Sequence, residues 1–181
     1  MEPEQLEKYL DPRRPISRRE QLDRFHSALE PLYWQAVRVR NIARSYRNFR
    51  VGCAVYAYRE DAGTLQGRWR VFYGMNTKVD ETSRPVCAEP IAIQAAYSAG
   101  CSEILGIIVV GEPQLDIHSK LECPTLHPCH ECRVFMKNHP IIPRHVRIFT
   151  ALPPVESDPP EGKWNELQTL NQILRLHGES T

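Results

Sequence analysis

The sequence predicts an α/β protein with a three-layer α/β/α arrangement around a central mixed sheet. Helix-like and strand-like segments follow one another in the order α-β-β-α-β-α-β-(α), which is typical of one sheet covered by helices on both faces. Residues 104–110 are nearly all apolar, as expected of a strand that is buried on both of its faces. Together these two observations indicate a single main core.

The first half of this pattern is a helix followed by two strands. From Leu32 onward, apolar residues recur every three or four positions, which predicts an amphipathic helix. Residues 51–58 and 70–74 are rich in β-branched and aromatic side chains, and a glycine-containing turn separates them. Two such runs joined by a turn indicate a β-hairpin.

The second half alternates helices with strands. Residues 88–100 are rich in alanine and end at Gly100, which predicts a small helix before the apolar strand. A further helix is expected at residues 129–138, directly after Pro128, and a further strand at residues 146–150.

Proline-containing stretches suggest how the chain is divided. Residues 1–30 are charged and interrupted by prolines, so we expect an N-terminal helical extension there, before a main domain at residues 31–151. Residues 152–181 begin with the break Leu152-Pro153-Pro154. They are expected to add a C-terminal helix at 164–176 that packs on the same domain through an apolar face, made of Leu167, Leu170, Ile173 and Leu174.

Composition describes an ordinary globular protein. The chain has 181 residues, of which 41% are hydrophobic and 25% charged, and its formal net charge is +1. This balance points to neither a nucleic-acid partner nor a membrane. No apolar run is long enough to cross a bilayer and the first residues do not form a signal peptide, so we expect a cytoplasmic protein.

Charge is nevertheless uneven along the chain. Residues 38–50 contain five arginines and no acid. The simplest interpretation is the solvated face of a helix. The alternative is a surface that binds anions or a second subunit.

Three cysteines and one glutamate carry the strongest chemical signal, in the sequences Cys87-Ala88-Glu89 and Pro128-Cys129-His130-Glu131-Cys132. Three thiolates can hold Zn²⁺ and leave its fourth position open for water, and a nearby carboxylate such as Glu89 can move that water's proton. Both groups of cysteines lie at predicted helix starts, where the helix dipole favours the thiolate form.

Other interpretations of these cysteines are a structural zinc site or buried thiols. A structural site usually has four ligands, and Cys123 is the main candidate for the fourth, although it would leave Glu89 unexplained. Arg133 directly follows Cys132 and either donates hydrogen bonds to the sulfurs, which would draw off negative charge, or is a surface residue. Cys53 and Cys101 are expected to be inert.

The pattern of ligand, x, Glu and Pro-Cys-x-x-Cys matches the signature of the zinc-dependent nucleobase deaminases. From about Tyr46 to Thr150 the chain resembles the homotetrameric cytidine deaminases in particular. The similarity rests on four segments in order, which are Tyr46-Arg47-Asn48-Phe49-Arg50-Val51-Gly52, Gly74-Met75-Asn76, Cys87-Ala88-Glu89-Pro90-Ile91-Ala92-Ile93 and Pro128-Cys129-His130-Glu131-Cys132-Arg133.

The resemblance implies a cytidine deaminase-like fold and a hydrolytic enzyme that releases ammonia from the exocyclic amine of a cytosine nucleoside. It implies Zn²⁺ on Cys87, Cys129 and Cys132, with Glu89 moving the protons of the reaction. Substrate-binding positions carried over from the family are Phe49 beside the base, Asn76 beside the sugar, Ala88 and Lys78. Phe49 has core packing as an alternative role, and Asn76 has a turn. The family also implies a small-molecule substrate and a homo-oligomer, either a tetramer or a dimer.

One departure from the family bears directly on the substrate. Two positions after the asparagine, relatives carry a glutamate that holds the ribose hydroxyl, and here that position is Lys78. A lysine ammonium cannot accept a hydrogen bond from a hydroxyl, but it can bind a phosphate or carboxylate. We therefore expect a modified or acidic cytidine derivative. The alternatives are a deaminase of nucleotides or nucleic acid, and a non-catalytic zinc-binding module of the same fold.

Overall fold

A computed structural model of the protein describes residues 16–60, 68–154 and 165–180. Its centre is a five-stranded sheet in the order β2-β1-β3-β4-β5. The strands are β1 (Val51–Tyr58), β2 (Trp69–Met75), β3 (Glu103–Gly111), β4 (Arg147–Ala151) and β5 (Asn165–Thr169). β1 runs antiparallel to β2 and β3, β3 and β4 are parallel, and β4 and β5 are antiparallel. The sheet is therefore mixed, as the sequence predicts.

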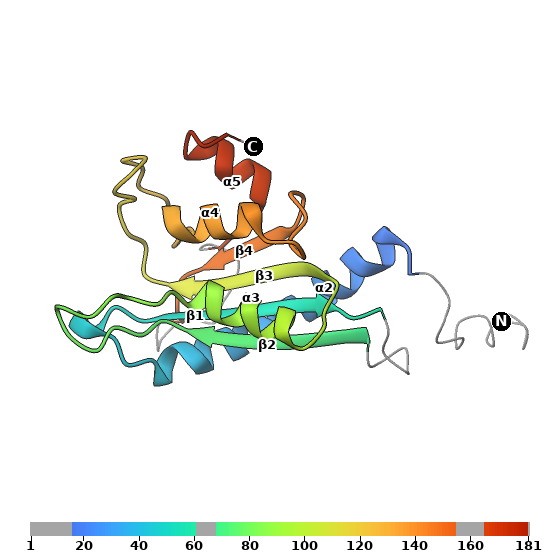
Figure 1. Cartoon of the computed structure of the whole chain (residues 1–181), viewed down its shortest axis with the longest axis horizontal. Coiled ribbons are helices and arrows are strands. Elements are labelled where there is room, and N and C mark those ends of the chain that lie inside the picture. Colours follow the sequence, from blue (N-terminus) through green and yellow to red (C-terminus); the bar gives the residue numbers. More distant parts are fainter. Residues whose placement is uncertain (1–15, 61–67, 155–164, 181) are drawn as a thin grey trace, which may run out of the picture.

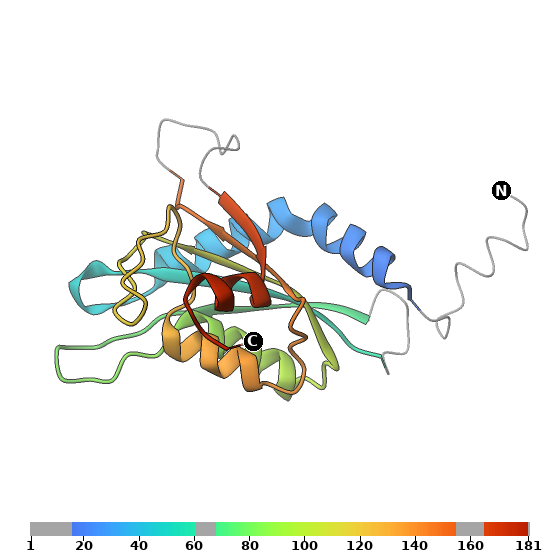
Figure 2. The same ribbon diagram turned by 90° about the horizontal axis from the view of Figure 1, so that it is seen from above.

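Helices cover both faces of this sheet. Figures 1 and 2 show α2 (Arg18–Ile42) on one face, and α3 (Ala88–Ser98) and α4 (His130–Asn138) side by side on the other, with α5 (Leu170–Leu176) next to α4. Two apolar clusters fill the spaces between the layers, one under α2 and the other under α3, α4 and α5. This confirms the predicted three-layer fold class.

The helix α2 is longer than the sequence pattern suggests. It begins at Arg18, where the Ser17 side chain accepts a hydrogen bond from the backbone N–H of Glu20, and it continues through Pro31. A proline inside a helix removes one hydrogen bond. Here Phe25 and Leu32, on either side of Pro31, are both buried in the cluster under α2, and this packing holds the helix together. The described part of residues 1–30 is thus continuous with the expected main domain, and residues 1–15 lie outside the described chain.

The prediction of a C-terminal helix at residues 164–176 is wrong for its first residues. Asn165–Thr169 forms the edge strand β5 beside β4, and only Leu170–Leu176 is helical. Thr169 starts that helix in a capping box with Gln172, in which each side chain receives a backbone N–H of the other. Trp164 lies outside the described residues. Of the four residues expected on its apolar face, Leu170, Ile173 and Leu174 are buried in the cluster under α3. Leu167 lies in β5 and is 38% exposed. The division at residues 30 and 151 stays a prediction.

Glycines let both helical layers approach the sheet closely. A Cβ atom at Gly106 of β3 would lie 2.2 Å from the ring of Phe25 in α2. A Cβ atom at Gly74 of β2 would lie 2.1 Å from the carbonyl oxygen of Ala88, the first residue of α3. The close packing of Gly74 against Ala88 fixes the start of α3, where Cys87 and Glu89 lie.

Candidate metal centre and active site

The three predicted ligands meet at the starts of two neighbouring helices. Cys87 is the N-cap of α3, Cys129 is the N-cap of α4, and Cys132 lies in the first turn of α4. Because α3 and α4 pack side by side on the same face of the sheet, the three sulfurs come within 4.8 Å of one another. This convergence agrees with the prediction from the sequence.

The separation of the sulfurs suits a tetrahedral metal ion. The Sγ atoms of Cys87 and Cys129 are 3.8 Å apart. Two sulfurs bound to one zinc at the usual distance of about 2.3 Å, with tetrahedral angles, would lie about 3.8 Å apart. Cys87 and Cys129 thus hold the spacing that Zn²⁺ requires, and the sulfur of Cys132 lies within 4.8 Å of both.

The three thiols also interact with one another. Hydrogen bonds from the thiols of Cys132 and Cys87 lower the pKa of Cys129, and the same interactions raise the pKa of both donors. A bound cation would hold all three sulfurs as thiolates.

Glu89 lies in the first turn of α3, two residues after Cys87, and is 5% exposed. Burial and, to a smaller extent, the negative charge of Cys129 raise the pKa of Glu89 to about 7. A carboxyl group with a pKa near neutrality can both accept and release a proton at working pH, which suits a general acid and base. Its neighbour Ala88 is fully buried.

The other expected substrate-binding residues come from the turn before β1 and from the end of β2. Phe49 is partly buried and packs against the apolar cluster under α3. Asn76 is 8% exposed, and its side-chain oxygen accepts the N–H of Val51 at 2.7 Å. Its amide nitrogen donates to the carbonyl oxygen of Phe49 at 2.8 Å and to Ser45 Oγ at 3.3 Å. Asn76 therefore ties the turn that carries Phe49 to the sheet.

Comparison with known families identifies this arrangement. The family model described as the cytidine and deoxycytidylate deaminase zinc-binding region matches residues 27–146. The chain belongs to this family. It is a zinc-dependent aminohydrolase of the cytidine deaminase type, and its cysteine cluster fits the zinc that gives the family its name.

Solved structures agree on the fold. A cytidine deaminase from Burkholderia pseudomallei is 22% identical and superimposes with a TM-score of 0.55 over 80% of this chain and 94% of its own. A cytidine deaminase from Mycobacterium leprae is 24% identical, with a TM-score of 0.51 over 81% of this chain and 96% of its own. A search among curated proteins finds no significant match. Within the described residues no helix is long and apolar enough to span a membrane.

In this deaminase, Arg133 is wholly buried in α4, directly after Cys132. Its hydrogen bonds in the described structure go to oxygen atoms and not to the sulfurs that the sequence analysis suggested. The guanidinium donates to Asp116 Oδ2 at 2.7 Å, to Glu179 Oε1 at 2.6 Å and to the carbonyl oxygen of Pro128 at 2.7 Å. Burial alone would raise the pKa of Asp116, but the hydrogen bond from Arg133 holds this pKa below its usual range. Arg133 thus connects the metal-binding helix with a loop and the C-terminal segment.

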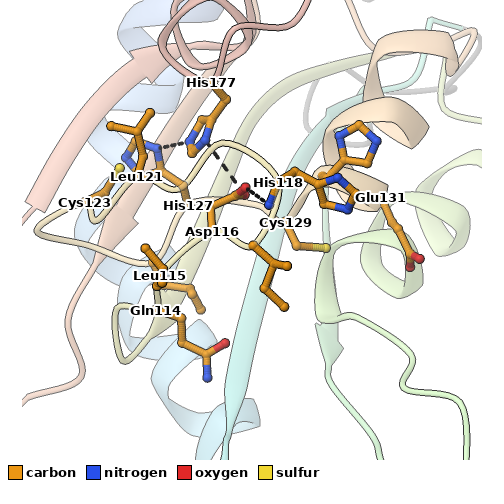
Figure 3. A pocket seen from close by; sticks show the side chains of 13 residues that line it. Gln114, Leu115, Asp116, His118, Leu121, Cys123, His127, Cys129, Glu131 and His177 are labelled. Carbon is orange, nitrogen blue, oxygen red and sulfur yellow. Dashed lines mark hydrogen bonds and ion pairs between the residues drawn. The ribbon is translucent and has the colours of Figure 1, made fainter.

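Cys123 does not join the three-cysteine cluster. Its sulfur lies within 4.8 Å of nitrogens of His127 and His177, and these three residues form a second group of metal-ligand type. They line a cavity of about 260 Å³, shown in Figure 3, that also reaches Cys129 but not Glu89. The sequence pattern predicts Cys123 only as a fourth ligand for the first site, and it gives no sign of His177.

Proposed function

We propose that this deaminase removes the exocyclic amine of a free cytosine nucleoside derivative that is modified or carries an anionic group. The observation that carries the proposal is Lys78, which stands where relatives have the ribose-binding glutamate. A cation there favours a phosphate or carboxylate over a neutral sugar hydroxyl as its partner.

The position of Lys78 supports this proposal. Thr77 exchanges two backbone hydrogen bonds of 3.0 Å with Val86, and Val86 directly precedes Cys87. The segment that carries Lys78 is therefore held beside the start of α3. The Lys78 ammonium lies 5.6 Å from the centre of the Tyr46 ring, and no acidic partner accompanies it among the described residues. Its positive charge is available to an anionic substrate.

Glu89 is the group that we propose moves protons during the reaction. Zinc, when bound by the three cysteines, supplies a Lewis acid that makes water a nucleophile at neutral pH. Glu89 sits beside this centre with a pKa of about 7, so it can take a proton from water and pass it to the ring nitrogen or to the departing amine. Its burial keeps bulk water from competing for those protons.

The neighbourhood of Asn76 suggests a different role from the expected contact with the sugar. Both of its N–H donors are engaged by protein oxygens. We propose that Asn76 positions Phe49, which remains our candidate for the wall of the base pocket.

The arginine-rich stretch supports a small substrate over a nucleic acid. Arg40 pairs with Glu112 at 3.6 Å and Arg47 with Glu81 at 3.7 Å, while Arg50 donates to the carbonyl oxygen of Asn41. Such pairing reduces the charge available for phosphates. Recognition of single strands also needs aromatic stacking along a basic groove.

We also propose that the deaminase forms a homo-oligomer, either a dimer or a tetramer. Apolar side chains are exposed on α3 and on the segment before it, with Val79 at 85%, Tyr97 at 46% and Val86 at 45%. An exposed apolar area beside an active site is typical of a subunit contact. Light scattering on the purified protein measures the oligomeric state, and a monomer at all concentrations would contradict this proposal.

An ammonia-release screen tests the substrate. The zinc-loaded protein is incubated with cytidine, deoxycytidine, their monophosphates, free cytosine, and cytidines modified on the base or sugar. The proposal expects at least one anionic or modified compound to exceed plain cytidine in kcat/KM. The variant Lys78→Glu should reverse that order, whereas Lys120→Glu, the same charge change on an exposed loop residue, should leave it unchanged. A preference for plain cytidine in the wild type, with no gain in the Lys78→Glu variant, refutes the anionic-substrate proposal.

A further inference from the structure

A second cluster of metal-ligand side chains lies near the three-cysteine site. Cys123 and His127 belong to the loop that leads into α4, and His177 caps the C-terminal end of α5. One sulfur and two ring nitrogens from these residues lie within 4.8 Å of one another. His127 and His177 are only 8% and 7% exposed. Two buried imidazoles beside a thiol form a ligand set that suits zinc.

Each imidazole is held from its far side. His127 Nε2 lies 3.1 Å from Glu166 Oε2, in β5. His177 Nδ1 lies 2.7 Å from Ser119 Oγ and 3.8 Å from Asp116 Oδ2. Metal-binding histidines are usually oriented in this way, with the second ring nitrogen on a carboxylate or another oxygen. The arrangement turns His127 Nδ1 and His177 Nε2 toward each other.

The spacing of these two nitrogens fits one metal ion. They are 3.1 Å apart, and Figure 3 shows the two rings facing each other beside Cys123. Two nitrogens bound to a tetrahedral zinc at the usual 2.0–2.1 Å would lie about 3.3 Å apart. The carboxylate of Glu166 adds negative charge beside the cluster, whereas that of Asp116 is paired with Arg133.

We propose that Cys123, His127 and His177 bind a second zinc ion, separate from the one at Cys87, Cys129 and Cys132. All three residues line the cavity of about 260 Å³, which is large enough to hold a water molecule as the fourth ligand. The ion would join the loop before α4 to the end of α5. Because His127 is two residues before Cys129, it would also fix the chain that carries a ligand of the first site.

The same geometry can also be explained without a metal, by hydrogen bonds alone. The experiment must distinguish these two interpretations. Ser119 can donate to His177, His177 to His127, and His127 to Glu166, so that every polar atom in the row has a hydrogen-bond partner. In that arrangement Cys123 takes no part. The sulfur therefore distinguishes the two interpretations.

Zinc stoichiometry provides the test. The full-length reduced protein is loaded with excess Zn²⁺ and passed over a desalting column, and metal and protein are measured by mass spectrometry and amino-acid analysis. The proposal expects two zinc ions per chain in the wild type and one in Cys123→Ser and His177→Gln. His118→Gln, which removes another histidine of the same cavity, should keep two. Circular dichroism identifies any variant that has unfolded, and Cys123→Ser, which preserves side-chain volume, is the less disruptive change.

Cobalt substitution supplies a second readout. Thiolate-to-cobalt charge transfer in the near ultraviolet grows with the number of Co–S bonds, so Cys123→Ser should lose roughly one quarter of that absorbance, one sulfur out of four.

One zinc per wild-type chain would overturn the proposal, whatever the variants bind. Two zinc ions retained in both Cys123→Ser and His177→Gln would also overturn it, because the second ion would then lie elsewhere.

Discussion

At the scale of single residues, Glu89 separates catalysis from metal binding. It is buried beside the cysteines, and its carboxyl group has a pKa near 7. We expect Glu89→Gln to lower ammonia release by roughly 100- to 10,000-fold, because a neutral amide of the same shape cannot transfer protons. Zinc content and the midpoint of thermal unfolding should stay close to wild type. Glu131→Gln, which changes an exposed glutamate in the first turn of the neighbouring helix α4, is the matched control. Equal turnover in wild type and Glu89→Gln would remove Glu89 from the mechanism.

We predict that Asn76 stabilises the folded protein and does not contact the substrate. Its side chain makes three hydrogen bonds, and removing it leaves the buried N–H of Val51 and the carbonyl of Phe49 without those partners. We expect Asn76→Ala to lower the free energy of unfolding by about 1–3 kcal/mol, measured by urea denaturation. Asn138→Ala loses a single hydrogen bond on the exposed side of α4 and should change stability far less. A fully stable Asn76→Ala with a raised KM would instead favour the sugar contact.

At the scale of helices and strands, the contact between α2 and β3 depends on the absence of a side chain at Gly106. An added Cβ would lie 2.2 Å from the Phe25 ring, far inside van der Waals contact. Overpacking of a well-filled core costs about 1–3 kcal/mol, and we expect Gly106→Ala to lose that much in urea denaturation. The same substitution in a Phe25→Leu background should cost less, because the shorter side chain leaves room. Additive effects of the two changes would show that the ring is not the obstacle.

The elements that the sequence could predict are those with strong local signals. The apolar run of β3 and the β-rich pair β1 and β2 were predicted to within one residue at each end, as was the start of α4. The strand β5 was not predicted, because Glu166, Leu167 and Gln168 have a higher propensity for helix than for strand. Pairing with the edge of β4 overrides that preference, and such a contact is invisible to local analysis. The Thr169-x-x-Gln172 capping box was the one local sign that the helix starts at Leu170.

The same distinction applies to the site. The ligands of the first cluster come from two short motifs, so their spacing could be recognised in the sequence. His177 joins Cys123 and His127 only because the loop before α4 folds against the end of α5. A single histidine 50 residues after its partner carries no local signal. The sequence suggested hydrogen bonds from Arg133 to the sulfurs, and its actual partners Asp116 and Glu179 depend on the same long-range packing.

At the scale of the whole molecule, the C-terminal segment is joined to the metal-binding helix through Arg133. This arginine is fully buried, and its nearest acids are Asp116 in the loop before α4 and Glu179 after α5. The same guanidinium bonds the carbonyl of Pro128, next to the ligand Cys129. The end of the chain and the first zinc site are thus parts of one network.

This network predicts that a change at Glu179 weakens both stability and metal retention. In Glu179→Gln, the buried Arg133 loses one of its two charged partners, and breaking a buried ion pair costs about 3–5 kcal/mol. Urea denaturation should show a loss of that order. The loss of zinc to a chelator should also become faster, because Arg133 no longer fixes the backbone beside Cys129. Glu122→Gln, an exposed glutamate in the loop before α4, should leave both properties unchanged. Wild-type stability in Glu179→Gln would mean that Asp116 alone suffices for Arg133, whereas reduced stability with unchanged zinc loss would confine the role of the C-terminal segment to folding.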